Sequence, residues 1–308
     1  MAWYGWAGLT LIALAKAVRW AGLHYGILPA LHRWVATWFT PIVWWGYILF
    51  LDAWLARRTR RSFLQNYPGE FIFMLIASNV CWLIFEDYNL LLRNWVYQNL
   101  PESLVEEWIG SLFAYATIFP GIFGTASVLA QLLGLPLQTT ARPLSVRARW
   151  LSMAVGLAML LGPLVAPARY RPYLFAPVWL GFIFLLDPVN ERLGGVSLLA
   201  QAKARNFQWI GTLLAAGYVC GFLWEYWNSW AETRWVYTIP FPTVFRIFEM
   251  PLLGFLGFGP FALECFCMYE TCRRVWRRTF RRPRMAEAFL MGALGHSGLA
   301  QGPSGDRG

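Results

Sequence analysis

Four glutamates in an unusually apolar sequence are the residues best suited to chemistry. Glu86 and Glu225 each lie inside a long apolar run, and Glu107 and Glu249 lie near the start of the runs that follow. Burial among apolar side chains favours the neutral form of a carboxyl group. A carboxyl that keeps its proton can give it to a substrate, so the sequence predicts four candidate catalytic acids.

The two central glutamates, Glu86 and Glu225, have similar neighbours. An asparagine follows each of them by three residues, and on a helix this spacing places Asn89 or Asn228 on the face of its glutamate. We expect each asparagine to orient its glutamate or the ligand of that glutamate. Aromatic residues complete the predicted substrate-binding set: Trp82, Phe85, Tyr97, Trp224, Trp227 and Tyr237. The sequence leaves an alternative open, in which a nearby arginine such as Arg234 pairs with an acid and makes it structural.

Two aspartates and the remaining polar residues point away from metal chemistry. Asp52 and Asp187 end their apolar runs close to Arg57 and Arg192, so we expect these aspartates to be structural. The cysteines and histidines lack the spacing of a metal site. An Asp-x-x-x-Asp pair, which would suit a magnesium diphosphate, is also missing. The sequence therefore predicts an activity without metal or cofactor.

The composition is that of an integral membrane protein. Of the 308 residues, 58% are hydrophobic and 14% are charged, whereas a soluble domain carries roughly 25% charged residues. The same figures exclude a disordered chain and a disulfide scaffold. The net charge of +10 would suggest nucleic acid in a soluble protein. Here the basic residues lie between apolar runs, so we expect contact with the lipid bilayer and no nucleic-acid partner.

Seven apolar runs approach the 20 or so residues that a helix needs to cross a bilayer. They are Val35–Leu55, Phe71–Leu92, Leu104–Leu132, Trp150–Val165, Tyr173–Leu186, Phe207–Tyr226 and Val244–Tyr269. Residues 1–34 combine a brief apolar stretch with basic residues at helical spacing. We expect an amphipathic interfacial helix there, with a partial span as the alternative. The expected fold class is an all-α polytopic membrane protein built as a seven-helix bundle.

The chain contains an internal repeat. The segment Trp45–Asp52 matches Leu180–Asp187, and Cys81–Asn89 matches Cys220–Asn228. A Trp-x-Tyr triplet follows in both copies, and a glutamate then stands near the start of the third span. Several uncommon residues recur in the same order, which is typical of a duplicated unit.

Three spans in each copy require an additional span between the copies if both are to have the same orientation. The sequence therefore predicts two parallel three-helix repeats plus a linker helix, a 3+1+3 arrangement. The expected divisions are an N-terminal helix in residues 1–34, repeat 1 in residues 35–133, a basic loop and linker span in residues 134–172, repeat 2 in residues 173–270, and an Arg-rich tail in residues 271–308 with a disordered end.

Positive charge gives the expected orientation of the bundle. If the loop after the first span is inside, the inner segments carry most of the Lys and Arg residues. This bias predicts a cytoplasmic C-terminus, and we expect a bacterial inner membrane. In this orientation Glu86, Glu107, Glu225 and Glu249 all fall in the outer half of the bundle, where they can share one site.

The three-span unit resembles the repeat of the membrane-embedded lycopene cyclases and the related transmembrane terpene cyclases. The shared features are an Asp that closes the first span, an aromatic-Glu pair in the second, a Trp-x-Tyr after it and an acid that opens the third. The resemblance implies that glutamates protonate an alkene or epoxide and that the resulting carbocation closes a ring without a redox cofactor. The implied acids are Glu86 and Glu225, with Glu107 and Glu249 beside them.

The expected function is that of an isoprenoid-modifying membrane enzyme, a cyclase or hydratase with a hydrophobic, isoprenoid-like substrate. Two other classes stay open. One is a small-solute transporter of the 3+1+3 type. The other is a non-catalytic subunit that binds pigment, quinone or lipid and associates with a membrane protein partner.

Overall fold

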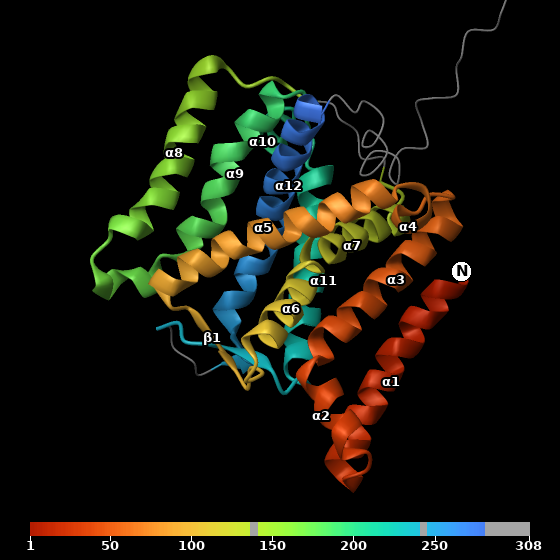
Figure 1. Cartoon of the computed structure of the whole chain (residues 1–308). Helices are drawn as coiled ribbons and strands as arrows, with labels where there is room; N and C mark the ends of the chain where they lie inside the picture. Colours follow the sequence, from red (N-terminus) through yellow and green to blue (C-terminus); the bar gives the residue numbers. More distant parts are fainter. Residues whose placement is uncertain (136–140, 241–244, 281–308) are drawn as a thin grey trace, which may run out of the picture.

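The computed structural model describes residues 1–135, 141–240 and 245–280. These residues form a bundle of α-helices with two short two-stranded β-ribbons (Figure 1). The start of the last expected span, at Val244, lies outside the described residues. Residues 281–308 also lie outside the described residues, and they include the end of the tail, Gly292–Gly308, for which disorder is expected.

Both copies of the repeat begin with the same order of elements, a long helix, a short helix, a long helix and a strand, and differ after that strand. The first copy contains α3 (Phe39–Thr59), α4 (Phe63–Asn66), α5 (Pro68–Leu92), β1 (Trp95–Gln98), α6 (Leu104–Tyr115) and α7 (Ile118–Leu132). The second contains α9 (Phe175–Arg192), α10 (Leu198–Lys203), α11 (Gln208–Asn228), β2 (Arg234–Tyr237), β3 (Arg246–Ile247), β4 (Met250–Pro251), the 3₁₀ helix η2 (Leu252–Gly257) and α12 (Phe258–Phe280). The other elements are α1 (Trp3–Tyr25), α2 (Pro29–Thr37), α8 (Val146–Val165) and the 3₁₀ helix η1 (Ala168–Tyr173).

Five helical stretches of the described chain are long and apolar enough to cross a membrane: α3, α5, the α6–α7 pair, α8 and the η2–α12 pair. They indicate an integral membrane protein. The expectation of seven spans included α9 and α11, which are helices of the bundle but fall outside this group. Three charged residues near the end of α9 and the many Trp, Tyr and Gly residues of α11 lower their apolar character.

The N-terminal helix α1 packs along α3 in the same way that α8 packs along α9 (Figure 1). α1 and α3 meet at two glycines, where a Cβ atom on Gly8 would lie 2.3 Å from the carbonyl oxygen of Gly46. α8 and α9 also meet at two glycines. A Cβ atom on Gly156 would lie 2.6 Å from the carbonyl oxygen of Gly181. Small residues allow helix backbones to approach closely.

This packing adds a feature that the expected 3+1+3 arrangement did not include. α8 has the place of the expected linker helix, and α1 has the same relation to the first repeat that α8 has to the second. α1 runs alongside α3 (Figure 1), and the expected interfacial or partial-span placement of residues 1–34 stays a prediction. The arrangement is therefore two units, each with one further helix packed against its first repeat helix.

A leucine at Gly156 should separate α8 from α9. The added side chain would meet the Leu185 backbone nitrogen, which lies 2.4 Å from the Cβ position. We expect a loss of about 1–3 kcal/mol in stability, as for other overpacked sites, measured as a lower midpoint of thermal unfolding in detergent. Gly162→Leu is the matched control, since nothing lies within 4 Å of its Cβ position. Equal midpoints for the two variants would contradict the close approach.

The β1–β2 ribbon joins the two copies near one end of the bundle (Figure 1). The strands are antiparallel, with Trp95 opposite Tyr237 and Tyr97 opposite Trp235. The two Trp-x-Tyr triplets therefore face each other about a local two-fold axis through the valines between them. The all-α expectation did not include these strands, although the alternation of the triplet is a β-type pattern.

Asp52 and Asp187 are structural, but their partners are not the expected arginines. Asp187 accepts hydrogen bonds from the Ser197 hydroxyl at 2.6 Å and from the next two backbone N–H groups at 2.6 and 3.0 Å. Asp52 accepts from the Ser62 hydroxyl at 2.5 Å, from the next backbone N–H at 2.7 Å and from the Tyr4 hydroxyl at 2.8 Å. Each serine is itself the N-cap of α10 or α4. Each aspartate therefore holds the first turn of the short helix that follows its span.

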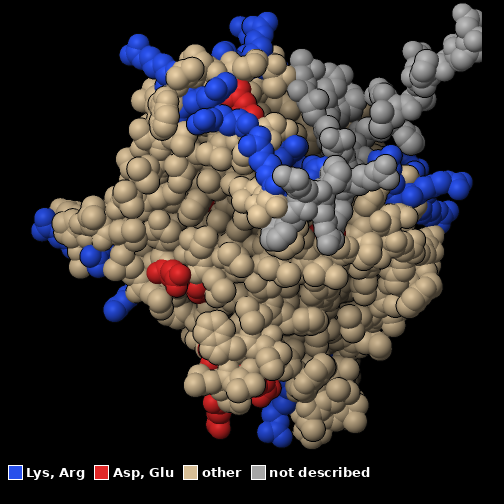
Figure 2. Space-filling model, turned by 45° about the horizontal axis from the view of Figure 1, so that its top comes forward, with Lys and Arg blue, Asp and Glu red and all other residues tan. Residues whose placement is uncertain are grey.

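Basic side chains gather along the upper side of the molecule in Figure 2, and smaller groups of charged residues lie at its left and lower edges. At the C-terminal end of α12 a buried ion cluster joins the two copies. Arg273 of α12 lies 2.9 Å from Glu270 and 4.0 Å from Glu70 of α5, and the Tyr269 hydroxyl donates to Glu70 at 2.5 Å. These contacts fix the start of α5 against α12.

Candidate functional site

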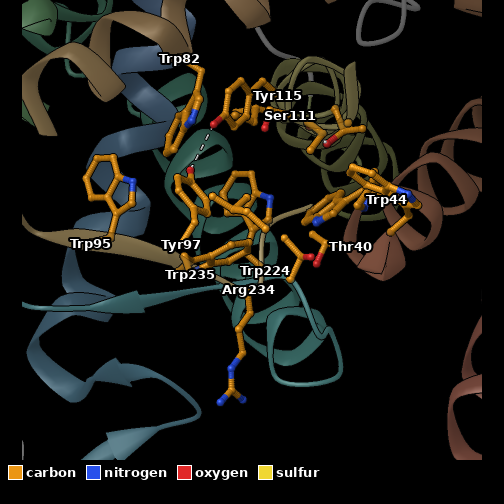
Figure 3. A pocket seen from close by; sticks show the side chains of 18 of the residues that line it. Thr40, Trp44, Trp82, Trp95, Tyr97, Ser111, Tyr115, Trp224, Arg234 and Trp235 are labelled. Atoms are coloured by element: carbon orange, nitrogen blue, oxygen red, sulfur yellow. Dashed lines mark hydrogen bonds between the residues drawn. The ribbon is translucent and has the colours of Figure 1, made fainter. Parts of the chain in front are cut away.

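A cavity of about 160 Å³ lies between the two copies of the repeat. Twelve of its 26 lining residues are aromatic, and they come mainly from helices of both copies and from the ribbon (Figure 3). The aromatic lining residues are Trp38, Trp44, Trp82, Trp95, Tyr97, Tyr115, Trp179, Trp224, Trp235, Tyr237, Phe258 and Phe261. Leu100, in the loop before α6, is the most exposed lining residue at 37%. The cavity therefore reaches the surface beside this loop.

The ribbon supplies four of the aromatic side chains. Alternate residues of a strand share a face, and directly paired residues of an antiparallel ribbon lie on the same face. Trp95 and Tyr97 of β1 therefore point to the same side as Trp235 and Tyr237 of β2, and all four line the cavity. The Trp-x-Tyr triplets of the sequence thus form one wall of the site.

Glu225 on α11 is the buried acid of the cavity. Its side chain has 0% exposure, and its Oε1 accepts hydrogen bonds from the Tyr237 hydroxyl at 2.7 Å and the Trp235 indole at 3.2 Å. Its Oε2 is buried without a hydrogen-bond partner. An unpaired buried oxygen is costly, and a proton on Oε2 would turn it into a donor for a ligand. The geometry thus leaves one fixed and one free oxygen on this carboxyl.

Glu86 has the equivalent place on α5 but a different environment. Its Oε1 accepts hydrogen bonds from the Tyr97 hydroxyl at 2.5 Å and the Trp82 indole at 2.8 Å. The Tyr115 hydroxyl donates to the Tyr97 hydroxyl at 3.4 Å (Figure 3). Tyr97, Trp82 and Tyr115 line the cavity, whereas Glu86 does not. Glu86 therefore reaches the cavity only through these side chains.

The two ribbon tyrosines stay protonated. Burial is the main reason that the pKa of Tyr97 and the pKa of Tyr237 lie well above the usual value, and the neighbouring glutamates raise them further. A raised pKa keeps the hydroxyl neutral through the physiological pH range. Each tyrosine therefore remains a hydrogen-bond donor to its glutamate.

Asn89 and Asn228 hold the ribbon on the helices and do not line the cavity. The Asn228 amide donates to the Trp235 carbonyl oxygen at 2.8 Å, and its oxygen accepts from the Trp235 N–H at 3.0 Å. Asn89 makes the same two bonds to Trp95, at 2.9 and 3.2 Å. Each asparagine therefore acts on its glutamate indirectly, because it positions the strand that carries the tyrosine.

The two acids expected near the start of the third spans, Glu107 and Glu249, have different surroundings. Glu107 on α6 lines the cavity, whereas Glu249 does not. Glu249 lies between β3 and β4 instead of at a helix start, with Oε1 3.5 Å from Nη1 of Arg234. It thus follows the alternative in which an arginine pairs with the acid.

The aromatic residues expected to bind substrate also fall into two groups, those that line the cavity and those that do not. Trp82 and Trp224 line the cavity, as Tyr97 and Tyr237 do. Phe85 and Trp227 pack behind the wall: the ring centroid of Phe85 lies 5.8 Å from Trp82, and that of Trp227 lies 4.8 Å from Trp44.

Several lining residues were not selected from the sequence. Trp44 and Trp179 stand directly before the two matched segments of the first repeat helix, so the repeat itself contained their signal. Tyr115 lacks such a signal, because α6 corresponds in the second copy to the 3₁₀ helix η2, which has a different sequence.

Five lining residues carry buried polar atoms without a hydrogen-bond partner. These atoms are Thr40 Oγ1, Trp44 Nε1, Trp95 Nε1, Glu225 Oε2 and Arg234 Nε. Buried polar atoms in folded proteins are almost always paired, so their presence around one cavity fits a ligand with a polar group as well as an apolar body.

The described part of the chain contains no group of three His, Cys, Asp or Glu side chains that could hold a metal ion. Comparison of the chain with protein-family models, with curated proteins and with solved structures gives no match.

Proposed function

We propose that the protein is a membrane enzyme that protonates a terpenoid or carotenoid and so drives its cyclisation or hydration. The observation that carries the proposal is the Glu225 carboxyl, which is fully buried, held through one oxygen and unpartnered on the other, at the wall of an aromatic cavity. A neutral carboxylic acid in this position is suited to general-acid catalysis. Cyclisation gives an isomer of the substrate, so electrons balance without a redox partner.

The aromatic lining suits the cation that protonation would create. Each ring face can attract a positive charge by about 0.5–2 kcal/mol, and several rings border this small space. Fixed groups that favour charge developing in the transition state are a major source of catalysis. The tryptophans and tyrosines would act in this way.

The size of the cavity limits how much of the substrate reacts there. Its volume of about 160 Å³ is close to the roughly 150 Å³ of an engineered cavity that holds benzene. One ring-sized end of an isoprenoid fits, and the rest of the chain would extend past Leu100. The unpaired indole N–H groups of Trp44 and Trp95 could bind an oxygen on that end.

The same proposal includes the orientation of the bundle. The C-terminus would lie in the cytoplasm of a bacterial cell, because the Arg-rich segments gather at the end of the bundle that holds the C-terminal part of α12. The two units would then be parallel about an axis normal to the membrane, as the two-fold register of the ribbon supports. The cavity would lie toward the outer side.

The test is turnover of two defined probes, lycopene and 2,3-oxidosqualene, by the full chain in lipid nanodiscs in D₂O. We expect at least one probe to give a product. A cyclised product should carry one deuterium in place of one hydrogen of the substrate, and a hydrated product should have the mass of the substrate plus one D₂O. Mass spectrometry and chromatography of the organic extract would detect it. If both probes bind but return unchanged and undeuterated, the cavity holds a ligand without acting on it and the enzyme proposal fails.

A further inference from the structure

The two equivalent glutamates are built for opposite proton-transfer roles. Glu225 has one oxygen without a donor and lines the cavity, so it can present a proton directly to a ligand. Glu86 and Glu225 each accept two hydrogen bonds on Oε1, but those on Glu86 are shorter: 2.5 Å from Tyr97 and 2.8 Å from Trp82, against 2.7 and 3.2 Å on Glu225. Shorter hydrogen bonds are typical of a charged acceptor, so Glu86 is the one better suited to be a carboxylate. Its contact with the cavity runs through the Tyr97 hydroxyl, which points its proton toward Glu86.

We propose that the Tyr97–Glu86 pair takes up the proton that leaves the substrate cation, while Glu225 supplies the proton that creates it. This division rests on the proposed function. It makes Tyr97 a catalytic residue that touches the substrate, and Glu86 a positioning residue that acts through Tyr97.

The steps balance in atoms and electrons. The π pair of the substrate alkene takes the proton from Glu225 Oε2, and a second alkene closes the ring onto the resulting cation. The C–H bond next to the new cation then breaks, its electron pair becomes a C=C bond, and its proton passes to the Tyr97 oxygen as the Tyr97 proton passes to Glu86. Water removes a proton from Glu86 and returns one to Glu225, so the net reaction is an isomerisation.

Tyr115 adds a second hydroxyl group beside the Tyr97–Glu86 pair that accepts the proton. Its hydroxyl donates to Tyr97 at 3.4 Å and lines the cavity from α6. This distance is long for an O–H···O bond, and such contacts often tighten only when the substrate is bound. A substrate that reaches into this corner therefore meets two linked hydroxyls that lead to one carboxylate.

The structure offers a matched control in the second copy. Tyr97→Phe removes a hydroxyl bonded to Glu86, and Tyr237→Phe removes the equivalent hydroxyl bonded to Glu225. We expect Tyr97→Phe to lower kcat by about 10²-fold and to shift the products toward alcohols and misplaced double bonds. Tyr237→Phe should slow protonation and keep the product ratio. Tyr97→Phe/Glu86→Gln should be no slower than Tyr97→Phe alone, because both changes interrupt one path.

Unchanged product ratios in Tyr97→Phe, or additive losses in the double variant, would overturn the proposal.

Infrared difference spectra of the resting protein test the two proton states without any turnover, so their result does not depend on the proposed function. Glu225→Gln should remove a carboxylic-acid C=O band, and Glu86→Gln should remove a carboxylate band. If neither probe is turned over, the proposed function fails for these substrates while the spectra still decide the two proton states. Reversed bands would overturn the assignment of acid and base.

Discussion

Replacing Glu225 with glutamine is expected to lower kcat for the active probe by about 10²–10⁴-fold and to leave KM almost unchanged. Glutamine keeps the shape of the side chain, and its oxygen can still accept the bonds from Tyr237 and Trp235. Its NH₂ group would take the place of the unpartnered Oε2 but cannot release a proton at neutral pH. Binding should persist because the aromatic lining is intact, so the loss should appear in kcat.

Two controls make this result specific to Glu225. Glu106→Gln removes an exposed acid on α6 and should leave turnover unchanged. Tryptophan fluorescence during thermal unfolding would show that Glu225→Gln is folded. If Glu225→Gln keeps more than about a tenth of the wild-type kcat, Glu225 is not the proton donor. Glu107→Gln would be the next variant to measure, since Glu107 also lines the cavity.

Internal duplication is the part of the fold that could be predicted from the sequence, and the reason is physical. Matched segments of a repeat have matched neighbours, so the Asp at the end of the first span and the Glu of the second fall at equivalent places in both copies. The role of α1 could not be found in this way. Its contact with α3 depends on Gly8 and Gly46, and a pair of glycines carries little pattern in a Gly-rich apolar chain.

In the site too, short sequence patterns could be predicted, whereas contacts between residues far apart in the sequence could not. Tyr97 and Tyr237 were predicted as binding residues because the Trp-x-Tyr triplet recurs in the sequence. That the two triplets pair with each other, and so bring Glu225 and the tyrosine bonded to Glu86 to one cavity, depends on an antiparallel contact between residues about 140 positions apart. Glu249 shows the reverse case: it matches Glu107 in the repeat, but the β3–β4 turn places it beside Arg234, and it does not line the cavity.

Asp187→Ala is expected to destabilise the protein by about 3–5 kcal/mol, the largest effect on stability among the variants considered. The carboxylate has 0% exposure and accepts hydrogen bonds from the Ser197 hydroxyl, from two backbone N–H groups at the start of α10 and, at 3.8 Å, from the Cys267 thiol. Alanine would leave these donors without a partner, and each unpaired buried group costs about 1–3 kcal/mol. The change should lower the midpoint of unfolding in a denaturant or heat titration followed by tryptophan fluorescence.

The comparison with neighbouring variants decides between two structural roles for Asp187. If it caps α10, Asp187→Asn should fall between alanine and the wild type, because the amide oxygen can still accept from one N–H while its NH₂ group faces the other. Arg192→Gln should have little effect, since Arg192 is exposed. If an ion pair with Arg192 held the aspartate instead, Arg192→Gln and Asp187→Asn would be equally damaging. Asp52→Ala should repeat the large loss in the first copy, because Asp52 accepts two hydrogen bonds at the start of α4 and one from the Tyr4 hydroxyl of α1.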